Sequence, residues 1–259
     1  MEPLTVFLGG RDLEMAEIAR LLAGRPGVAV CDHGPAWGVR ASAYLPELRA
    51  ALAAGRRAVL VELADDLPAD LPRDRLTWVD HHGPLAGANR PTSLEQVFAL
   101  LGRPAGEWTR DRELVAANDR GHIAGLLRAG ATAAEVRDIR ARDRRAQGVT
   151  ADEEASGQEA AAAAESHLGG RLTVVRLPHA RTAVATDFLH PALGGPGYEN
   201  LVALCPGETV FFGSGAAVAA LRAAHPDGWY GGELPARGFW GVGRPLPLPD
   251  LLRTLEPAL

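Results

Sequence analysis

The tripeptide Asp80-His81-His82 places one carboxylate and two imidazoles directly after the short apolar run 76–79. A run of apolar and β-favouring residues that ends in a turn predicts a buried strand, and Gly83 marks that turn. In open α/β sheets, ligands bind at the carboxyl edge of the strands. Carboxylates and imidazoles are ligands for divalent transition metals, Mn²⁺ among them. The tripeptide therefore indicates a metal site, with a turn-capping Asp beside two surface histidines as the alternative.

Other acidic residues stand at comparable places near the ends of expected strands. Asp12 and Glu14 follow the apolar run 4–8, where each could bind a metal, although Asp12 is also a favoured residue for capping a helix. Glu62 interrupts an apolar strand at its carboxyl end, with Asp65 close behind as a second choice. A buried carboxylate is costly unless it meets a cation or hydrogen-bond donors. These positions predict that several carboxylates share one edge of the sheet.

A further acidic residue, Asp119, lies within a stretch of helical periodicity. It stands four residues from both Val115 and Ile123, which places it on the buried face of the expected helix. An acidic group on that face needs a partner. A metal ion is one candidate, and Arg120 or a backbone group is the alternative.

The apolar periodicity of the chain predicts an α/β fold in two parts. In the first part, strands are expected at 4–8, 28–31, 58–63 and 76–79, with helices at 13–23, 41–54, 93–101 and 111–127. In the second part, strands are expected at 172–177, 182–186, 201–204 and 209–212, with a helix after residue 215. Strands that alternate with helices indicate a mainly parallel, doubly wound sheet. We expect a domain at 1–130, a helical connection at 131–168 and a smaller α/β domain at 169–259.

The second part offers candidate substrate-binding residues of a less specific kind. They are Gly213, Ser214, Gly215, Gly231, Gly232 and Arg237. The first three open a helix, so their backbone N–H groups could hold a phosphate, or they could simply make a tight strand–helix turn. Arg237 could bind phosphate while the neighbouring aromatic residues stack on a base, unless those aromatics pack into a small core.

Composition limits the classes of protein to which the chain can belong. The 259 residues are 47% hydrophobic, carry a formal net charge of −5 and include two cysteines, Cys31 and Cys205. No apolar stretch is long enough to span a bilayer, and the first residues lack the pattern of a signal peptide. Two cysteines imply neither a disulfide framework nor a cysteine-based zinc site. We expect a cytoplasmic protein with a small phosphorylated substrate and no membrane or long nucleic acid as partner, and a homodimer is one option for its assembly.

The order of the acidic and histidine clusters resembles the DHH phosphoesterase superfamily, by motif over residues 4–125 and by layout over the whole chain. Asp80-His81-His82 matches the third motif outright. The stretch 10–14 matches the first motif, Glu62 the second and Asp119 the fourth. The resemblance implies a parallel-sheet domain, a smaller C-terminal domain and a site for two ions, Mn²⁺ or Mg²⁺.

The resemblance also implies a role for each matching residue. The metal ligands would be Asp12, Glu14, Glu62, His81 and Asp119. His82 would contact the phosphate, and Asp80 would orient the imidazoles.

The chain departs from the superfamily pattern at several positions. Gly10 stands where the first motif has a histidine, Glu14 and Glu62 replace aspartates, and the Gly-Gly-Gly-His motif of the C-terminal domain is missing. Asp32 or His33, which end the neighbouring strand, are candidates to replace the missing histidine as a metal ligand.

The residues and the resemblance together predict a metal-dependent phosphoesterase. Its substrate would be a small phosphodiester or phosphoanhydride, such as a short oligonucleotide, a cyclic dinucleotide or a polyphosphate, attacked by a water that two metal ions activate. The alternative is a module that keeps the fold and binds a nucleotide or phosphate without turnover. Hydride transfer is disfavoured, because no glycine fingerprint follows the first strand.

Overall fold

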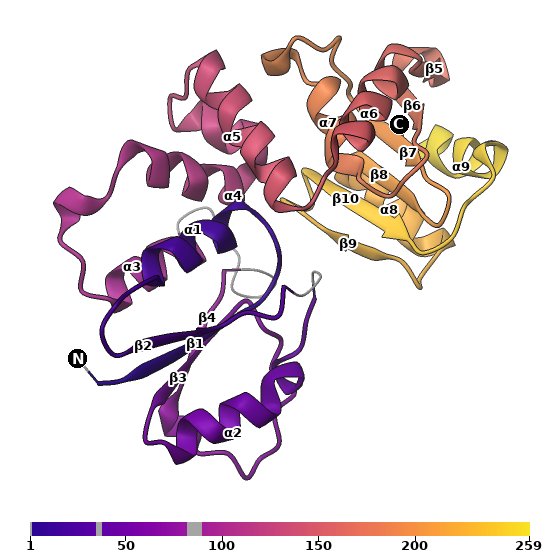
Figure 1. Ribbon diagram of the computed structural model, residues 1–259. Helices are drawn as coiled ribbons and strands as arrows, with labels where there is room; N and C mark the ends of the chain where they lie inside the picture. Colours follow the sequence, from indigo (N-terminus) through magenta and orange to yellow (C-terminus); the bar gives the residue numbers. More distant parts are fainter. Residues whose placement is uncertain (1, 35–37, 82–89) are drawn as a thin grey trace. The chain divides into compact units, whose positions relative to one another are not determined.

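The computed structural model describes residues 2–34, 38–81 and 90–259. The chain forms two compact units, Met1–Gln147 and Gly148–Leu259, whose elements are labelled in Figure 1. The boundary between them falls inside the segment 131–168 that we expected to be a helical connection. No helix in the described ranges is both long and apolar enough to cross a membrane.

The first unit is built on a four-stranded parallel sheet, as predicted. Its strands are β1 (Leu4–Leu8), β2 (Val28–Cys31), β3 (Arg57–Val61) and β4 (Leu76–Val79), in the order β2-β1-β3-β4. The crossover helices are α1 (Leu13–Leu22) and α2 (Leu45–Ala53), which cover opposite faces of the sheet (Figure 1). The sheet is therefore doubly wound, and the strand order reverses direction between β1 and β3.

The strand register brings the candidate residues of this unit to one edge. Leu8 pairs with Val61, and Val61 pairs with Val79, so β1, β3 and β4 end at the same level. Glu62 and Asp80 directly follow these last pairs. Ligand sites of open α/β sheets lie at the carboxyl edge where the strand order reverses, and this edge is that place.

Three further helices complete the first unit. They are α3 (Ser93–Leu100), α4 (Arg110–Arg128) and α5 (Ala133–Ala146). A capping box between Thr92 and Glu95 fixes the start of α3. The helix α4 is broken at Gly121 and His122, whose backbone angles are not helical. The segment of α4 that contains Asp119 therefore ends just after that residue.

The second unit holds a mixed six-stranded sheet. Its strands are β5 (Glu165–His167), β6 (Leu172–Arg176), β7 (Leu201–Leu204), β8 (Thr209–Ser214), β9 (Trp229–Gly231) and β10 (Arg237–Val242), in the order β5-β6-β7-β8-β10-β9. Its helices are α6 (Ala151–Ala162), α7 (Thr182–Phe188), α8 (Gly215–Ala224) and α9 (Leu248–Leu255). Phe211, Leu221 and Trp240 are fully buried in its core. The strands β6 and β7 are parallel, and the other pairs are antiparallel.

Two expectations for the middle of the chain are corrected by the structure. Residues 182–186, expected to be a strand, lie in α7, where Val184 packs against α6 so closely that a Cβ on Gly157 would lie 2.4 Å from a Val184 methyl group. This packing overrides the strand preference of the β-branched residues. Residues 131–168 are also not one connection, because they contribute α5 to the first unit and α6 and β5 to the second.

Candidate metal centre

Four side chains meet at the carboxyl edge of the first sheet. They are Glu14 from α1, Glu62 after β3, His81 after β4 and Asp119 from α4, and one potential ligand atom of each lies within 4.8 Å of those of the others. The Nε2 atom of His81 lies 2.5 Å from Asp119 Oδ2, 3.5 Å from Glu62 Oε1 and 3.7 Å from Glu14 Oε2. Residues that are up to 105 positions apart in the sequence (14 to 119) thus form one cluster.

The backbone at the end of β3 is shaped around Glu62. Glu62 has a φ of +52°, a left-handed conformation that is uncommon for a residue with a side chain and is often found at functional sites. Gly9 approaches it so closely that a Cβ there would lie 2.5 Å from the Glu62 carbonyl oxygen. Only glycine fits at this crossing, so the Gly9-Gly10 pair after β1 lets the chain pass beside the carboxylate.

The first turn of α3 holds two of the carboxylates in place. The backbone N–H of Leu94 donates to Glu14 Oε1 over 2.9 Å, and the Ser93 hydroxyl donates to Glu62 Oε1 over 2.8 Å. The positive end of the helix dipole also favours negative charge at this position. The other oxygen of Glu14, Oε2, is buried and lies 3.7 Å from His81 Nε2. Glu14 is therefore anchored by one oxygen and directs the other toward the cluster.

Asp12 performs the capping role that the sequence left open. Its Oδ1 accepts a hydrogen bond of 2.8 Å from the N–H of Met15 and so caps α1. Its Oδ2 is buried and forms no hydrogen bond among the residues described. Asp12 interacts electrostatically with Asp119, Glu62 and Glu14, but it is not one of the four residues whose ligand atoms meet. Asp12 thus lies beside the cluster as the N-cap of α1.

The pKa values show how strongly the cluster is charged. Burial alone lowers the pKa of an imidazole, yet hydrogen bonds to Asp119, Glu14 and Glu62 outweigh burial and raise the pKa of His81 to about 12. Burial, followed by repulsion from Glu14, raises the pKa of Asp119 to about 7. Burial and then Asp119 raise the pKa of Asp12 well above its usual range. In the absence of a metal ion, the positive charge of protonated His81 thus partly balances the negative charge of the carboxylates.

The pKa of Glu14 shifts in the other direction. Burial raises it, but hydrogen bonds from His81 and the Leu94 backbone outweigh burial, and the net pKa is lowered. Glu14 is therefore held as a carboxylate, the form that binds a cation.

The donor set fits a divalent ion. Three carboxylates and one imidazole are the ligand types that Mn²⁺ and related metals take. Bonds of about 2.0–2.3 Å to one ion bring its ligands within several ångströms of each other, as these four are. Arg120, the alternative partner for Asp119, is bound to Glu95 instead. The buried Glu14 Oε2, which lies 3.7 Å from His81 Nε2, is a further indication, since a buried carboxylate is costly unless it meets a cation or hydrogen-bond donors.

A second buried polar network links the helices that carry two of the cluster residues, α1 and α4, to α5. Arg140 is completely buried in α5, where it donates to Asn118 over 2.8 Å and to Asp143 over 2.7 Å. Asp143 also accepts a hydrogen bond of 3.1 Å from the N–H of Leu13. This network therefore ties α5 both to the residue that precedes Asp119 and to the first turn of α1, and its groups bond one another.

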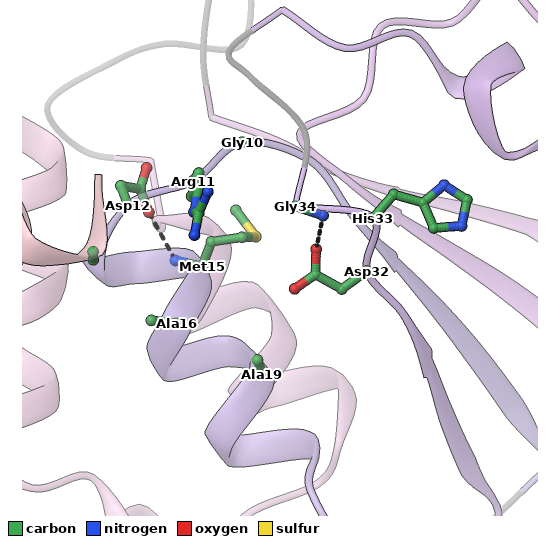
Figure 2. A pocket seen from close by; sticks show the side chains of 10 residues that line it. Gly10, Arg11, Asp12, Met15, Ala16, Ala19, Asp32, His33 and Gly34 are labelled. Atoms are coloured by element: carbon green, nitrogen blue, oxygen red, sulfur yellow. Dashed lines mark hydrogen bonds between the residues drawn. The ribbon is translucent and has the colours of Figure 1, made fainter. Parts of the chain in front are cut away.

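A cavity of about 440 Å³ lies beside Asp12, and Asp32 and His33 are also in its lining (Figure 2). Asp32 accepts a hydrogen bond of 2.7 Å from the N–H of Gly34, the turn-capping arrangement. The His33 ring stacks on Tyr44 at 4.5 Å and points away from Asp12 in Figure 2. Neither residue belongs to the four-residue cluster. The structure thus does not bring His33 to the place of the missing histidine.

Three other predicted residues of this unit are placed as follows. Asp65 is bound to Arg73 at 2.7 Å on the surface, so Glu62 is the carboxylate of this strand end that reaches the cluster. The carbonyl oxygen of Asp80 accepts a hydrogen bond from Gln96 over 3.0 Å. His82 lies outside the described residues.

In the second unit, the turn 213–215 already uses its backbone N–H groups. The N–H of Ser214 donates to Asn200 Oδ1 over 2.8 Å, and the N–H of Gly215 donates to the Ala236 carbonyl over 3.0 Å. Ser214 itself caps α8. A Cβ on Gly215 would lie 1.9 Å from the Pro235 carbonyl oxygen, so glycine is needed for close packing. The tight strand–helix turn accounts for these residues, and the phosphate site predicted there is not supported.

The aromatic end of the second unit divides into a core part and a surface part. Trp240 is fully buried, whereas Trp229 and Phe239 are 45% and 39% exposed. Gly231 and Gly241 lie under these exposed rings, within contact distance of them. Gly232 and Arg237, which were also predicted to bind substrate, have structural explanations of their own. Gly232 has a φ of +102° that suits glycine, and Arg237 donates to the Glu199 carbonyl over 2.7 Å.

Sequence reasoning did not find the groups that hold the cluster. The donors Ser93 and Leu94 were not singled out, although the Thr92…Glu95 spacing is a recognisable signature for the start of a helix. Arg140 and Asp143 lie in a stretch dense in charged residues, where nothing distinguishes a buried pair from solvated ones.

The geometry defines a candidate divalent-metal centre in a doubly wound α/β unit. Comparison with solved structures found distant likenesses. An exonuclease RecJ bound to manganese is 16% identical, with 98% of this chain and 89% of that chain covered at a TM-score of 0.45. A DHH domain from a member of a family of ribosomal proteins is 11% identical, with 98% and 85% covered at a TM-score of 0.48.

A pGpG-specific phosphodiesterase from Vibrio cholerae is 15% identical, with 99% and 96% covered at a TM-score of 0.42. No family model and no curated protein matches the sequence. These likenesses are distant and concern the fold, so the activity has to be argued from the chain's own residues.

Proposed function

We propose that this protein is a divalent-metal-dependent phosphoesterase that acts on a small phosphodiester or phosphoanhydride. The observation that carries the proposal is the meeting of Glu14, Glu62, His81 and Asp119 at the edge where the strand order reverses. The motif resemblance adds phosphoester hydrolysis as the reaction. Mn²⁺ is the proposed ion, with Mg²⁺ as the alternative.

Each side chain would have a defined task. Glu14, Glu62, His81 and Asp119 would bind the ion, and the first turn of α3 would hold the two glutamates in position. When bound, a divalent ion would supply an activated water and a positive charge beside the leaving oxygen. Arg11 lines the adjacent cavity and supplies a cation for a phosphate group. His82 would contact the phosphate, as the resemblance implies.

The size of the substrate is proposed from the size of the site and from charge. The cavity beside Asp12 has a volume of about 440 Å³, which suits a small ligand. The net charge of −5 gives no overall attraction for long nucleic acids. A short oligonucleotide, a cyclic dinucleotide and a polyphosphate are the substrates to test first.

Hydrolysis of bis(p-nitrophenyl) phosphate tests the proposal. We expect activity that requires Mn²⁺ and disappears with EDTA, and we expect His81→Ala to abolish both activity and Mn²⁺ binding. His82→Ala should lower turnover and leave the metal content nearly intact, so it is the matched control for loss of a neighbouring imidazole. Equal metal loss in the two variants would contradict this division of roles.

The binding-module alternative has its own observable outcome. A protein that binds Mn²⁺ and a nucleotide but hydrolyses no phosphodiester, nucleotide or polyphosphate with any divalent ion would support it. The engaged N–H groups of the turn 213–215 are consistent with that alternative, because they remove one expected contact to substrate.

A further inference from the structure

We infer that the cavity beside Asp12 binds the base of a nucleotide substrate and that Asp32 selects guanine there. The inference rests on the proposed function and narrows its substrate class, which otherwise includes polyphosphates. Three features of the cavity carry it: the position beside the metal centre, the apolar wall and the charges of the lining.

The cavity adjoins the metal centre through Asp12. The Asp12 side chain lines the cavity and also interacts electrostatically with three carboxylates of the cluster. A substrate whose phosphate is held at the ion would therefore extend its remaining part into the cavity. The volume of about 440 Å³ lies within the roughly 300–1,000 Å³ of small-molecule sites, and a phosphate group alone would leave most of it unfilled.

One wall of the cavity is apolar and consists mainly of small side chains. Met15, Ala16 and Ala19 lie on one face of α1, because residues three and four positions apart stand above one another on a helix. Ala146 adds a methyl group from the end of α5. A planar ring can lie close against such a wall and bury its apolar face. A polyphosphate has no apolar surface to bury there.

The charges of the lining disfavour a chain of phosphates. Among the described residues that line the cavity, Arg11 is the one lysine or arginine, and it is accompanied by the carboxylates of Asp12 and Asp32. Because a polyphosphate is negatively charged along its whole length, these carboxylates would repel it. A nucleotide base is uncharged at neutral pH and meets no such repulsion. The lining therefore favours a nucleotide over a polyphosphate.

Asp32 supplies a hydrogen-bond acceptor in the cavity. Its Oδ1 accepts a hydrogen bond of 2.7 Å from the N–H of Gly34, and its carboxylate points toward α1, whereas the His33 ring points away (Figure 2). Guanine presents two adjacent donors, the N1–H and the N2 amino group. Adenine presents one amino group beside a ring nitrogen that is an acceptor. A carboxylate only accepts, so it matches both guanine donors and is repelled by the adenine ring nitrogen.

Calorimetry with nucleoside 5′-monophosphates tests the inference in the full-length protein with Mn²⁺. The probes are guanosine, inosine and adenosine monophosphate, and inosine differs from guanosine only by lacking the N2 amino group. We expect guanosine monophosphate to bind at least about tenfold more tightly than adenosine monophosphate, as for hydrogen bonds to a charged group, with inosine monophosphate between them. Equal Kd values for the three nucleotides would overturn the inference.

Asp32→Asn separates recognition of the base from folding of the turn. Asparagine also accepts the N–H of Gly34, so the turn is kept, but its other atom is a donor in place of an acceptor. The variant should lose the preference for guanosine monophosphate. Asp65→Asn changes a surface carboxylate outside the cavity and is the matched control that should keep the preference. An unchanged preference in Asp32→Asn would overturn the role of Asp32.

Ala16→Leu tests the apolar wall. Ala16 is exposed on α1, and leucine is a good helix former, so the substitution narrows the cavity and leaves the helix intact. It should weaken binding of all three nucleotides by about tenfold, as for an overpacked site, with an unchanged Kd for Mn²⁺. Ala50→Leu, at an exposed position on α2, is the control and should change neither. Unchanged nucleotide binding in Ala16→Leu would contradict a base site in this cavity.

The two proposals fail separately. A wild type that prefers guanosine monophosphate but hydrolyses no bis(p-nitrophenyl) phosphate would overturn the proposed function and leave the base site standing. A wild type that hydrolyses this ester but binds the three nucleotides equally would overturn the base site alone. Circular dichroism confirms that each variant is folded.

Discussion

Two neighbouring residues on α4 belong to two buried polar clusters of opposite character. Asn118 accepts a hydrogen bond from Arg140, which also binds Asp143, so an arginine balances the acid there. Asp119 faces Glu14, Glu62 and His81, where three carboxylates meet one imidazole. Both clusters are buried and both join distant parts of the chain. The difference lies in whether the protein supplies the balancing charge.

This difference separates a structural network from a binding site. A buried ion pair with its hydrogen bonds satisfied is complete, and its removal only destabilises the fold. A buried cluster with excess negative charge costs free energy in the absence of a cation. The chain retains that cost at the one edge of the sheet where the fold favours a ligand. The following predictions test the contrast.

The largest effect is expected on the balanced side. Arg140→Met removes a buried cation and leaves Asp143 without its partner, which should cost about 3–5 kcal/mol of unfolding free energy. Urea unfolding of the metal-free protein measures this. The control is Arg142→Met. The Arg142 side chain is partly exposed and pairs with Asp111, so its loss should cost about 1 kcal/mol or less. Equal losses in the two variants would mean that burial does not distinguish these pairs.

On the unbalanced side, the same kind of change should have the opposite sign. Asp119→Asn removes a carboxylate whose pKa is raised to about 7 by burial and by Glu14, so the metal-free protein should become more stable. The variant should also lose most of the stabilisation by Mn²⁺, since a ligand is removed. Asp143→Asn provides the contrast, because it should lower the Tm with or without Mn²⁺. A Tm of metal-free Asp119→Asn below that of the metal-free wild type would contradict the proposed difference between the two clusters.

The stability of the metal-free protein should depend on pH through the charged groups of the metal centre. The pKa of Asp119 is about 7 in the folded chain and about 3.9 unfolded, and that of His81 is about 12 against about 6.5. In both cases the folded state binds more protons, so the stability of the metal-free protein should fall as pH rises, through about 4–7 for Asp119 and about 6.5–12 for His81.

Thermal melts between pH 6 and pH 9 measure this slope. Mn²⁺ replaces the protons, so its stabilising effect should grow with pH over the same range. Asp119→Asn should show a shallower slope, because His81 then loses one of its acidic partners. A metal-free Tm that rises with pH would contradict the assigned pKa values.

The smallest effect is expected at the second-choice carboxylate. Asp65→Asn breaks a surface pair with Arg73, which should cost less than about 1 kcal/mol and leave the Kd for Mn²⁺ unchanged. Glu62→Gln is its counterpart and should abolish Mn²⁺ binding. Calorimetric titration of both variants decides which carboxylate near the end of β3 faces the ion.

The sequence predicted those parts of the fold and site that depend on local pattern. The four parallel strands and the helix that carries Asp119 follow from apolar periodicity, and strand ends place Glu62 and His81 at one edge. The sequence could not decide whether Asp12 caps a helix or binds a metal, because both roles favour an acidic residue at that position. The prediction of a strand at 182–186 was wrong, because the packing of this segment against α6 cannot be read from its local sequence.

The second unit shows that glycine-rich turns alone do not predict a phosphate-binding loop. The turn 213–215 has the composition of a phosphate-binding loop, yet its glycines serve the close approach of Pro235 and Asn200. Such contacts come from residues in other turns of the chain. They can be read from coordinates but not from the spacing of the glycines.

Crystals grown with Mn²⁺ and measured at the manganese absorption edge test the central claim most directly. The account predicts an anomalous peak at about 2.0–2.3 Å from donor atoms of Glu14, Glu62, His81 and Asp119. Absence of a peak at these four residues, or an ion held instead by Asp12 and Asp32 in the neighbouring cavity, would contradict it.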